Sequence, residues 1–470
     1  MLFYEPMFVT FFAGFYALYL LATGSITKKA ALLIASVLFY LWGEPVFVLV
    51  LLLSTAVDYA LSFYLDEKTP RRLRRLALTA GIAGNLGMLI VCKYADFLLG
   101  NINALLAPFG PHLLPLLHVA LPIGVSFVVF EKITYLVDTY RGVSRRAASL
   151  SDYALFVFFF PKLLAGPILK YHEMKDQIAA PPSIQWSDFV DGFLRFARGL
   201  GRKLLIADPL GTFANQVFVA DPGGLGASYA WLGLGCFAVQ IYFDFAGYSD
   251  MAIGLARMLG FRLSENFNSP YVSQSLTEFW RRWHISLTSW IRDYLYRPLG
   301  GNRHGEARTY LNLWICFLAS GLWHGASWNF VLWGAYNGLF LTLDRLFLRD
   351  ALQRCGRIVA TAVTLFIVMI GWALFRAEQP SQLMPFLGAL FGMSRGTAAL
   401  EIPAEVPLTL LIGVLLSLFP ATPLYPWLAQ AHQQVAWLRW GTAAALVLIY
   451  VLALARAFAV PFQPFIYFRF

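Results

Sequence analysis

Charged side chains are scarce in this sequence. Only 13% of its 470 residues are Asp, Glu, Lys or Arg, whereas 59% are hydrophobic. Soluble domains carry about 25% charged residues, so a chain this long with so few would expose large apolar patches to water. The composition therefore argues against two or three soluble domains and predicts one large helical bundle in a membrane.

Several signatures of soluble enzymes are also missing. We find no HExxH, GxSxG, P-loop or GxGxxG pattern, the usual marks of metalloproteases, serine hydrolases, NTPases and Rossmann enzymes. The four cysteines form no CxxC pair and lie in or beside apolar stretches. We interpret them as small buried residues and expect neither a disulfide framework nor a metal site. They are Cys92, Cys236, Cys316 and Cys355.

Positive charge exceeds negative charge, with 36 Lys and Arg against 26 Asp and Glu. In a membrane protein such residues collect in cytoplasmic loops beside anionic lipid head groups, so we expect membrane lipids and no nucleic acid as partners. The apolar run from Phe8 to Leu21 has no basic segment before it. We therefore expect it to be the first spanning helix and not a cleaved signal.

Long apolar runs predict an all-α polytopic protein with roughly ten to thirteen membrane-embedded helices of about 20 residues, some of them re-entrant. Five clear candidates precede Arg146, and shorter, less regular runs follow it. The early runs are 6–22, 30–42, 45–65, 76–99 and 118–137. The later ones are 153–169, 231–248, 310–322, 330–348, 358–375, 406–419 and 440–458. No repeat or long linker marks off a second domain, so we expect one domain over 1–470.

Basic clusters alternate along the first part of the chain. Lys28–Lys29, Arg71–Arg75 and Arg141–Arg146 fall in alternate loops, whereas the loop from Gly100 to His118 has no Lys or Arg. The positive-inside rule places the basic loops in the cytoplasm and the N-terminus outside. The basic segment Asp344–Arg357 is expected in the cytoplasm as well.

The stretch from Gly260 to Gly325 is too polar to span lipid as one helix and is dense in Trp, Tyr and basic residues. Within it we predict a helix over Thr277–Tyr296, on which Trp280, His284 and Leu287 share a face. His324 follows an apolar run in GLWHGASW, and an ionisable residue at membrane depth is a functional candidate by default.

Plainer interpretations stand beside these. His324 could be a neutral core histidine bonded to a carbonyl, and His284, next to two arginines, could be an interfacial residue. For Asp244 and Asp250, structural ion pairing is favoured over a catalytic role.

Several long segments resemble the membrane-bound O-acyltransferase family, and more narrowly its members that acetylate alginate, peptidoglycan or cellulose. They are LPIGVSFVVFEKITYLVDTYRG from Leu121, FFFPKLLAGPILKY from Phe158, QIYFDFAGYSDMAIGLARMLGF from Gln240, ENFNSPYVSQSLTEFWRRWHISLTSWIRDYLYRPLGGNR from Glu265, GLWHGASWNFVLWGAYNG from Gly321, FRA from Phe375, and the terminal PFIYFRF. We expect the C-terminal part to be shorter than in the alginate subunit, which leaves the polymer open.

The resemblance implies a helical body around a tunnel, in the bacterial inner membrane. It implies His324, in the WHG motif, and His284, in RRWHISL, as catalytic residues. The implied donor is acetyl-CoA from the cytoplasm, and no metal is implied. The CoA phosphates would be bound by four arginines, namely Arg281, Arg282, Arg292 and Arg303. The implied acceptor is a cell-envelope polysaccharide, reached through a periplasmic acetyltransferase partner.

Two rival functions remain open. A transporter or flippase for an envelope precursor would involve no covalent chemistry, but it often has broken helices in matching halves, and we find no such pairing. An acyltransferase of the same fold could also use a longer acyl donor, which the width of the tunnel would decide.

Overall fold

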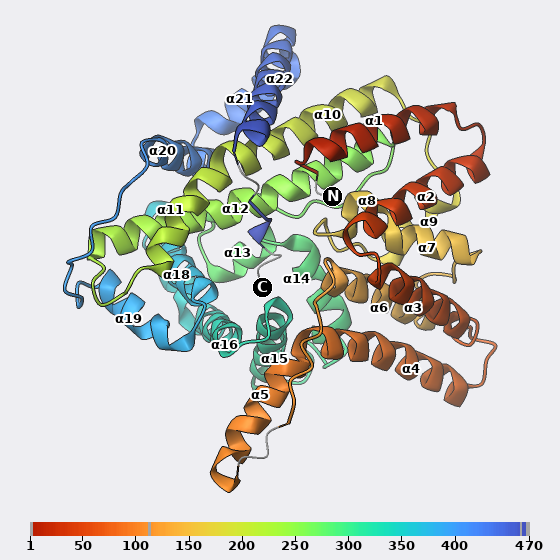
Figure 1. Ribbon diagram of the computed structural model, residues 1–470, viewed down its shortest axis with the longest axis horizontal. Coiled ribbons are helices and arrows are strands. Elements are labelled where there is room, and N and C mark those ends of the chain that lie inside the picture. The colour runs from red at the N-terminus through yellow and green to blue at the C-terminus, as the bar shows by residue number, and fades with distance from the viewer. Residues whose placement is uncertain (1–2, 111–113, 461–462, 467–470) are drawn as a thin grey trace. The chain divides into compact units, whose positions relative to one another are not determined.

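The computed structural model describes residues 3–110, 114–460 and 463–466, and these are helices and loops without a strand (Figure 1). The chain forms two compact units, one of Met1–Phe193 with Ala252–Ser264 and the other of Leu194–Met251 with Glu265–Phe470. The chain crosses from one unit to the other three times, after residues 193, 251 and 264. The helices are α1 (Pro6–Leu21), α2 (Ser25–Gly43), α3 (Phe47–Ser62), α4 (Arg71–Leu89), α5 (Ala95–Leu106), α6 (Val125–Tyr140), α7 (Leu150–Phe158), α8 (Phe160–Leu163), α9 (Tyr171–Ala179), α10 (Trp186–Gly201), α11 (Asp208–Val219), α12 (Ala227–Met258), α13 (Leu276–Arg282), α14 (Ile285–Ile291), α15 (Glu306–His324), α16 (Trp328–Leu343), α17 (Arg349–Arg354), α18 (Arg357–Arg376), α19 (Pro380–Leu390), α20 (Glu405–Leu418), α21 (Leu424–Gln434) and α22 (Ala436–Ala459).

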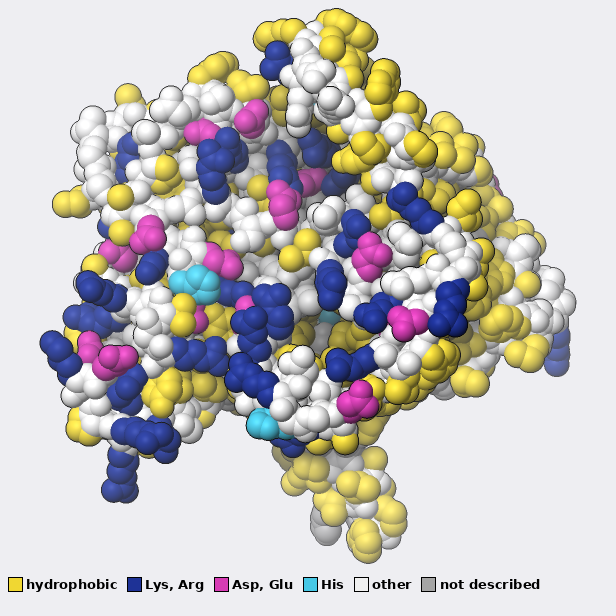
Figure 2. All heavy atoms as spheres, turned by 180° about the vertical axis from the view of Figure 1, so that it is seen from behind, with side chains coloured by type: hydrophobic (Ala, Val, Ile, Leu, Met, Phe, Trp, Pro, Cys, Tyr) yellow, Lys and Arg dark blue, Asp and Glu magenta, His cyan; other side chains and the backbone are white. Residues whose placement is uncertain are grey.

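Five helical stretches are long and apolar enough to cross a membrane, or six if the bent pair 405–421 and 424–434 counts as one span. The five are Ser25–Gly43, Arg71–Phe109, Ala227–Met258, Arg357–Arg376 and Ala436–Ala459. The apolar helices α1 and α3 are shorter. These helices confirm an all-α polytopic membrane protein. On the face that Figure 2 presents, Lys and Arg side chains are widespread, and hydrophobic side chains gather along the right-hand flank.

The first unit keeps its basic loops at one end. Lys29, at the start of α2, forms an ion pair of 2.8 Å with Asp152 at the start of α7. Arg74, at the start of α4, donates a hydrogen bond of 2.6 Å to the carbonyl of Tyr140 at the end of α6. The three basic clusters of the first part of the chain therefore lie at the same end of this unit, as alternating loops require.

The core of the first unit contains two ion pairs whose four side chains are almost fully buried. Lys132 on α6 lies 3.3 Å from Asp58 on α3, and its neighbour Glu131 pairs with Lys162 on α8. Asp58 also accepts hydrogen bonds from Asn85 at 2.9 Å and 3.0 Å. Because each of these ionisable groups has a partner of the opposite type, α6 can carry Glu131 and Lys132 side by side inside the unit.

The second unit depends on close contacts between helices at glycines. A Cβ on Gly199 of α10 would lie 2.5 Å from the carbonyl oxygen of Gly247 on α12. In the hairpin of α15 and α16, a Cβ on Gly334 would lie 2.5 Å from the Phe317 carbonyl oxygen. Only glycine permits such close approach, so these positions set the spacing of α10 against α12 and of α15 against α16.

Several features differ from the sequence-based predictions. The run 153–169 is divided among α7, α8 and a loop, and the run 118–137 is helical only from Val125. The single helix predicted over Thr277–Tyr296 is wrong, because α13 ends at Arg282 and α14 begins at Ile285. Trp280, His284 and Leu287 therefore share no single helix face. Helix α10 was not predicted, because its apolar residues recur at helical spacing without forming a continuous run.

Candidate active site

His324 is the last residue of α15, at the point where the chain turns back into α16. Gly321 makes this tight hairpin possible, because a Cβ there would collide with the carbonyl oxygen of Phe330. A Cβ on Gly325 would likewise collide with the ring of Phe330. The two glycines on either side of the histidine thus permit close packing of α15 against α16.

Aromatic rings enclose the His324 side chain, which is only 5% exposed. The centroid of its ring lies 4.9 Å from that of Trp323, 5.1 Å from that of Trp333 and 5.3 Å from that of Phe375. Trp333 comes from α16 and Phe375 from the end of α18. Three helices therefore position this histidine in a largely apolar environment.

His284 lies in the break between α13 and α14 and is fully buried. Its φ of 43° and ψ of 54° put it in the left-handed region, which is uncommon for a residue with a side chain. Asn266, 18 positions earlier, supports this conformation. Its backbone carbonyl accepts the N–H of Ile285 at 2.9 Å, and its side-chain oxygen accepts the Ser286 hydroxyl at 2.9 Å.

The hydrogen bonds of Asn266 determine the tautomer of His284. The Asn266 Oδ1 lies 3.0 Å from Nδ1 of His284 and also accepts the backbone N–H of Ser286 at 3.3 Å. An N–H can only donate, so this atom is the amide oxygen, and Nδ1 must carry the proton. In the neutral ring, Nε2 is then the atom that can accept a proton.

Burial also affects the charge of His284, which lies outside the helices that are long and apolar enough to span the membrane. Desolvation lowers the pKa of His284 to about 3, because the charged imidazolium loses its hydration in this environment. The ring is therefore neutral near pH 7.

Trp323 brings the two histidines into one cluster. Its ring centroid lies 4.9 Å from that of His324 and 6.1 Å from that of His284. Phe245, from α12, covers His284 with a ring-to-ring distance of 4.6 Å. The two histidines chosen from the sequence thus contact the same ring, although 40 positions separate them. Sequence reasoning missed Asn266 and Trp323, which lie in the ENFNSP and GLWHG segments already singled out.

The four arginines assigned to the donor differ in their surroundings. Arg282 is bound to Glu278 at 2.8 Å, and Arg292 is bound to Asp293 at 3.0 Å. Arg281 and Arg303 are exposed, and neither forms an ion pair with a carboxylate in the described part of the chain. Of the four, only Arg281 and Arg303 can therefore bind a phosphate without first breaking an ion pair with a described carboxylate.

Other polar candidates have structural roles. Asp250 pairs with Arg195 at 2.9 Å and with Arg202 at 2.6 Å, and Asp244 pairs with Lys203 at 3.0 Å, which confirms the prediction of ion pairing. Asn329, at the start of α16, donates a side-chain hydrogen bond to the carbonyl of Ala377.

Comparison with known proteins decides the family. A probable alginate O-acetylase AlgI of Pseudomonas putida is 37% identical over 99% of this chain and 98% of its own length. The family model described as MBOAT, the membrane-bound O-acyltransferase family, matches residues 139–350. This chain belongs to the membrane-bound O-acyltransferase family. Both His284 and His324 lie in the part of the chain that the family model matches.

Two further relatives are named for different polymers, one for alginate and the other for peptidoglycan. A probable alginate O-acetylase AlgI of Pseudomonas aeruginosa is 42% identical over 79% of this chain and 70% of its own length. The peptidoglycan O-acetyltransferase of Helicobacter pylori is 34% identical over 84% of this chain and 80% of its own length. The terminal PFIYFRF segment carried part of the resemblance, but its residues 467–470 lie outside the described residues.

Proposed function

We propose that this acyltransferase moves acetyl groups from cytoplasmic acetyl-CoA toward hydroxyl groups of a cell-envelope polysaccharide, with an alginate-type exopolysaccharide favoured and peptidoglycan or cellulose as the other candidates. The names of the relatives support acetylation of such a polymer. The observation that carries the proposal is the contact of the buried histidines His284 and His324 with one ring, that of Trp323.

In the proposed reaction, His324 is the general base. Its neutral imidazole takes the proton of the acceptor hydroxyl while the oxygen attacks the thioester carbonyl. A C–O bond forms, the C–S bond breaks, and the imidazolium returns the proton to the sulfur of the departing CoA. His284 is the second catalytic residue, and its Nε2 can accept a hydrogen bond from the hydroxyl and orient it for attack.

The site is expected to work across the bacterial inner membrane, within a single catalytic domain of residues 1–470. The phosphates of CoA would approach Arg281, Arg282, Arg292 and Arg303 from the cytoplasm. The acceptor hydroxyl, carried by a periplasmic acetyltransferase partner, would enter a tunnel from the other side and leave it as the acetyl ester. The partner would then transfer the acetyl group to a hydroxyl of the polymer. The basic loops at one end of the first unit support a periplasmic N-terminus.

The decisive experiment compares His324→Gln with the wild type at equal membrane abundance. Glutamine keeps hydrogen bonding and approximate size but cannot take up and release the proton, so polymer acetylation should fall about 100- to 10,000-fold. His432→Gln, at an exposed position on α21, is the matched control and should retain activity. Near-normal acetylation by folded His324→Gln would move the base to His284. Polymer export without consumption of acetyl-CoA would instead favour the transporter or flippase.

A further inference from the structure

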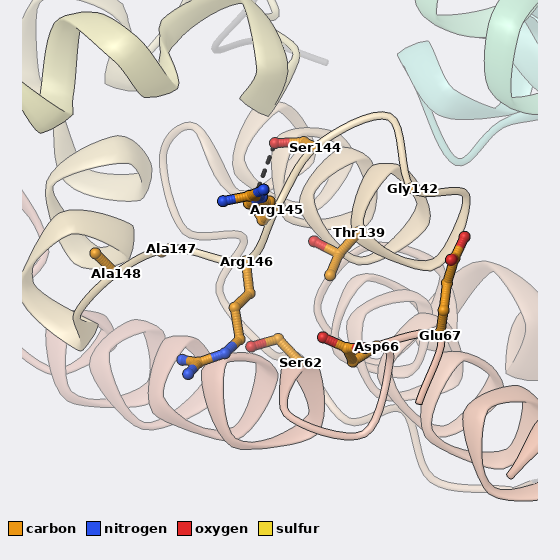
Figure 3. Close-up of a pocket in the computed structure, with 10 residues that line it drawn as sticks. All are labelled: Ser62, Asp66, Glu67, Thr139, Gly142, Ser144, Arg145, Arg146, Ala147 and Ala148. Atoms are coloured by element: carbon orange, nitrogen blue, oxygen red, sulfur yellow. Dashed lines mark hydrogen bonds between the residues drawn. The ribbon is translucent and has the colours of Figure 1, made fainter. Parts of the chain in front are cut away.

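A cavity of about 490 Å³ lies in the first unit (Figure 3), and its lining includes none of His284, Trp323 and His324. It is formed by two loops, one between α3 and α4 and one between α6 and α7. Its volume lies within the range of about 300 to 1,000 Å³ that is usual for small-ligand sites. Nothing in the proposed acetyl transfer uses this cavity.

Charges of opposite sign line opposite sides of the cavity. Figure 3 shows Arg145 and Arg146, from the second loop, on one side and the carboxylates of Asp66 and Glu67, from the first loop, on the other. A purely anionic ligand would be repelled by the carboxylates, and a purely cationic one by the arginines. The arrangement suits a ligand that carries a phosphate at one end and an ammonium group at the other.

Hydrogen bonds hold the floor of the cavity in place. Tyr135 donates its hydroxyl proton to Ser62 at 2.9 Å and accepts the backbone N–H of Ala147 at 3.3 Å. Arg74 ties the two loops together, because it donates to the carbonyls of Leu65 at 3.2 Å and Tyr140 at 2.6 Å. The cavity is therefore formed before a ligand arrives, which lowers the entropic cost of binding.

The surroundings indicate that this ligand comes from the lipid bilayer. Leu49, Leu53 and Val57 are exposed along one side of α3, and this apolar stripe leads toward the loop at the cavity. Phe63, at the end of α3, is half exposed, and the guanidinium of Arg146 lies over its ring at 4.1 Å. One arginine thus lies where an apolar face meets a polar cavity, the position of a lipid head group.

We propose that this cavity binds the phosphoethanolamine head group of a phospholipid at the end of the first unit that carries the basic loops. Arg145 and Arg146 bind its phosphate, because a planar guanidinium matches two phosphate oxygens. Asp66 and Glu67 accept hydrogen bonds from its primary ammonium group. A trimethylated choline head group has no N–H to donate, so the site discriminates against it.

The test measures the lipids retained by the purified full-length protein and its thermal unfolding in detergent with added lipid. The probes are phosphatidylethanolamine, phosphatidylglycerol and phosphatidylcholine with identical acyl chains. The wild type should prefer phosphatidylethanolamine about tenfold, since hydrogen bonds to charged groups are worth that much or more. Equal retention of the three lipids by the wild type would overturn the proposal.

Paired variants test the two sides of the cavity separately. Asp66→Asn with Glu67→Gln should shift the preference to phosphatidylglycerol, because the repulsion of an anionic head group is removed. Arg145→Gln with Arg146→Gln should lose the preference altogether. Arg72→Gln with Arg75→Gln, which alters exposed arginines on the same end of the unit but outside the cavity lining, is the matched control. An unchanged lipid preference in either cavity variant would contradict the assignment.

Soluble phosphoethanolamine separates a lipid from a free metabolite. If the acyl chains bind along α3, the soluble compound should stabilise the protein much less than the lipid at equal concentration. Equal stabilisation would show that the ligand is a soluble zwitterion, which would overturn the lipid assignment.

Discussion

The side-chain oxygen of Asn266 lies 3.0 Å from Nδ1 of His284 and holds the imidazole with Nε2 available as the proton acceptor. Asn266 has no expected contact with substrate, so its contribution is to position the histidine. Partners of this kind typically change activity by about 10- to 100-fold when they are removed, as in the second shells of metal sites.

We predict that Asn266→Ala lowers polymer acetylation by about that factor, whereas Asn266→Asp restores part of it, since a carboxylate also accepts the Nδ1 proton. The carboxylate would favour the imidazolium and so raise the pKa of His284 from its low value. As the pH is lowered, Asn266→Asp should therefore lose activity at a higher pH than the wild type does. A pH–rate profile identical in the two proteins would mean that His284 does not act through this hydrogen bond.

The two pairs of arginines assigned to the donor should differ in their contribution to acetyl-CoA binding. Arg281→Gln with Arg303→Gln should raise the KM for acetyl-CoA several-fold, because both guanidinium groups are exposed and not committed to a described carboxylate. The effect should shrink at high salt, where exposed charges are screened. Arg282→Gln with Arg292→Gln is the comparison and should change KM less, because these side chains already bind Glu278 and Asp293. Unchanged donor binding after all four replacements would remove the assignment and leave the family intact.

The close spacing of α10 and α12 predicts that one added methyl group at Gly199 lowers the stability of the protein. In Gly199→Ala the new Cβ would lie 2.5 Å from the Gly247 carbonyl oxygen and 2.7 Å from the Met251 nitrogen, so α10 and α12 must separate. We expect a loss of about 1–3 kcal/mol in the free energy of unfolding, measured in detergent. Gly84→Ala on α4 meets nothing within 4 Å and should be neutral or stabilising by up to about 1 kcal/mol. Equal stability of the two variants would argue against close contact at Gly199.

The alternation of basic loops predicts accessibility from opposite sides of the membrane. After replacement of the four native cysteines by serine, Leu105→Cys should react with an impermeant maleimide added to the periplasm. Lys68→Cys, in the loop before α4, should react only after the membrane is permeabilised. Labelling of both positions from one side would reverse or break the proposed topology.

Sequence reasoning succeeded where the signal was local and failed where it depended on distant partners. The long apolar runs predicted helices such as α12, α18 and α22, and the expected burial of His324 is observed, whereas its catalytic role stays a prediction. The break at His284 was missed because nothing near it forbids a helix. It arises from bonds to Asn266, which lies 18 positions away and replaces the helical hydrogen bonds with its own. Helix α10 was missed because a search for continuous apolar runs passes over an amphipathic pattern.

The two buried ion pairs of the first unit have a consequence for how the protein enters the membrane. Adjacent Glu131 and Lys132 make α6 a poor candidate for insertion by itself, since each charge at the centre of a lone helix costs about 2.5–3.5 kcal/mol. Their partners, Lys162 and Asp58, come from segments made after and before α6. We therefore expect α6 to remain beside the insertion machinery until α8 has been made, and these segments to enter the lipid together as one charge-neutral group.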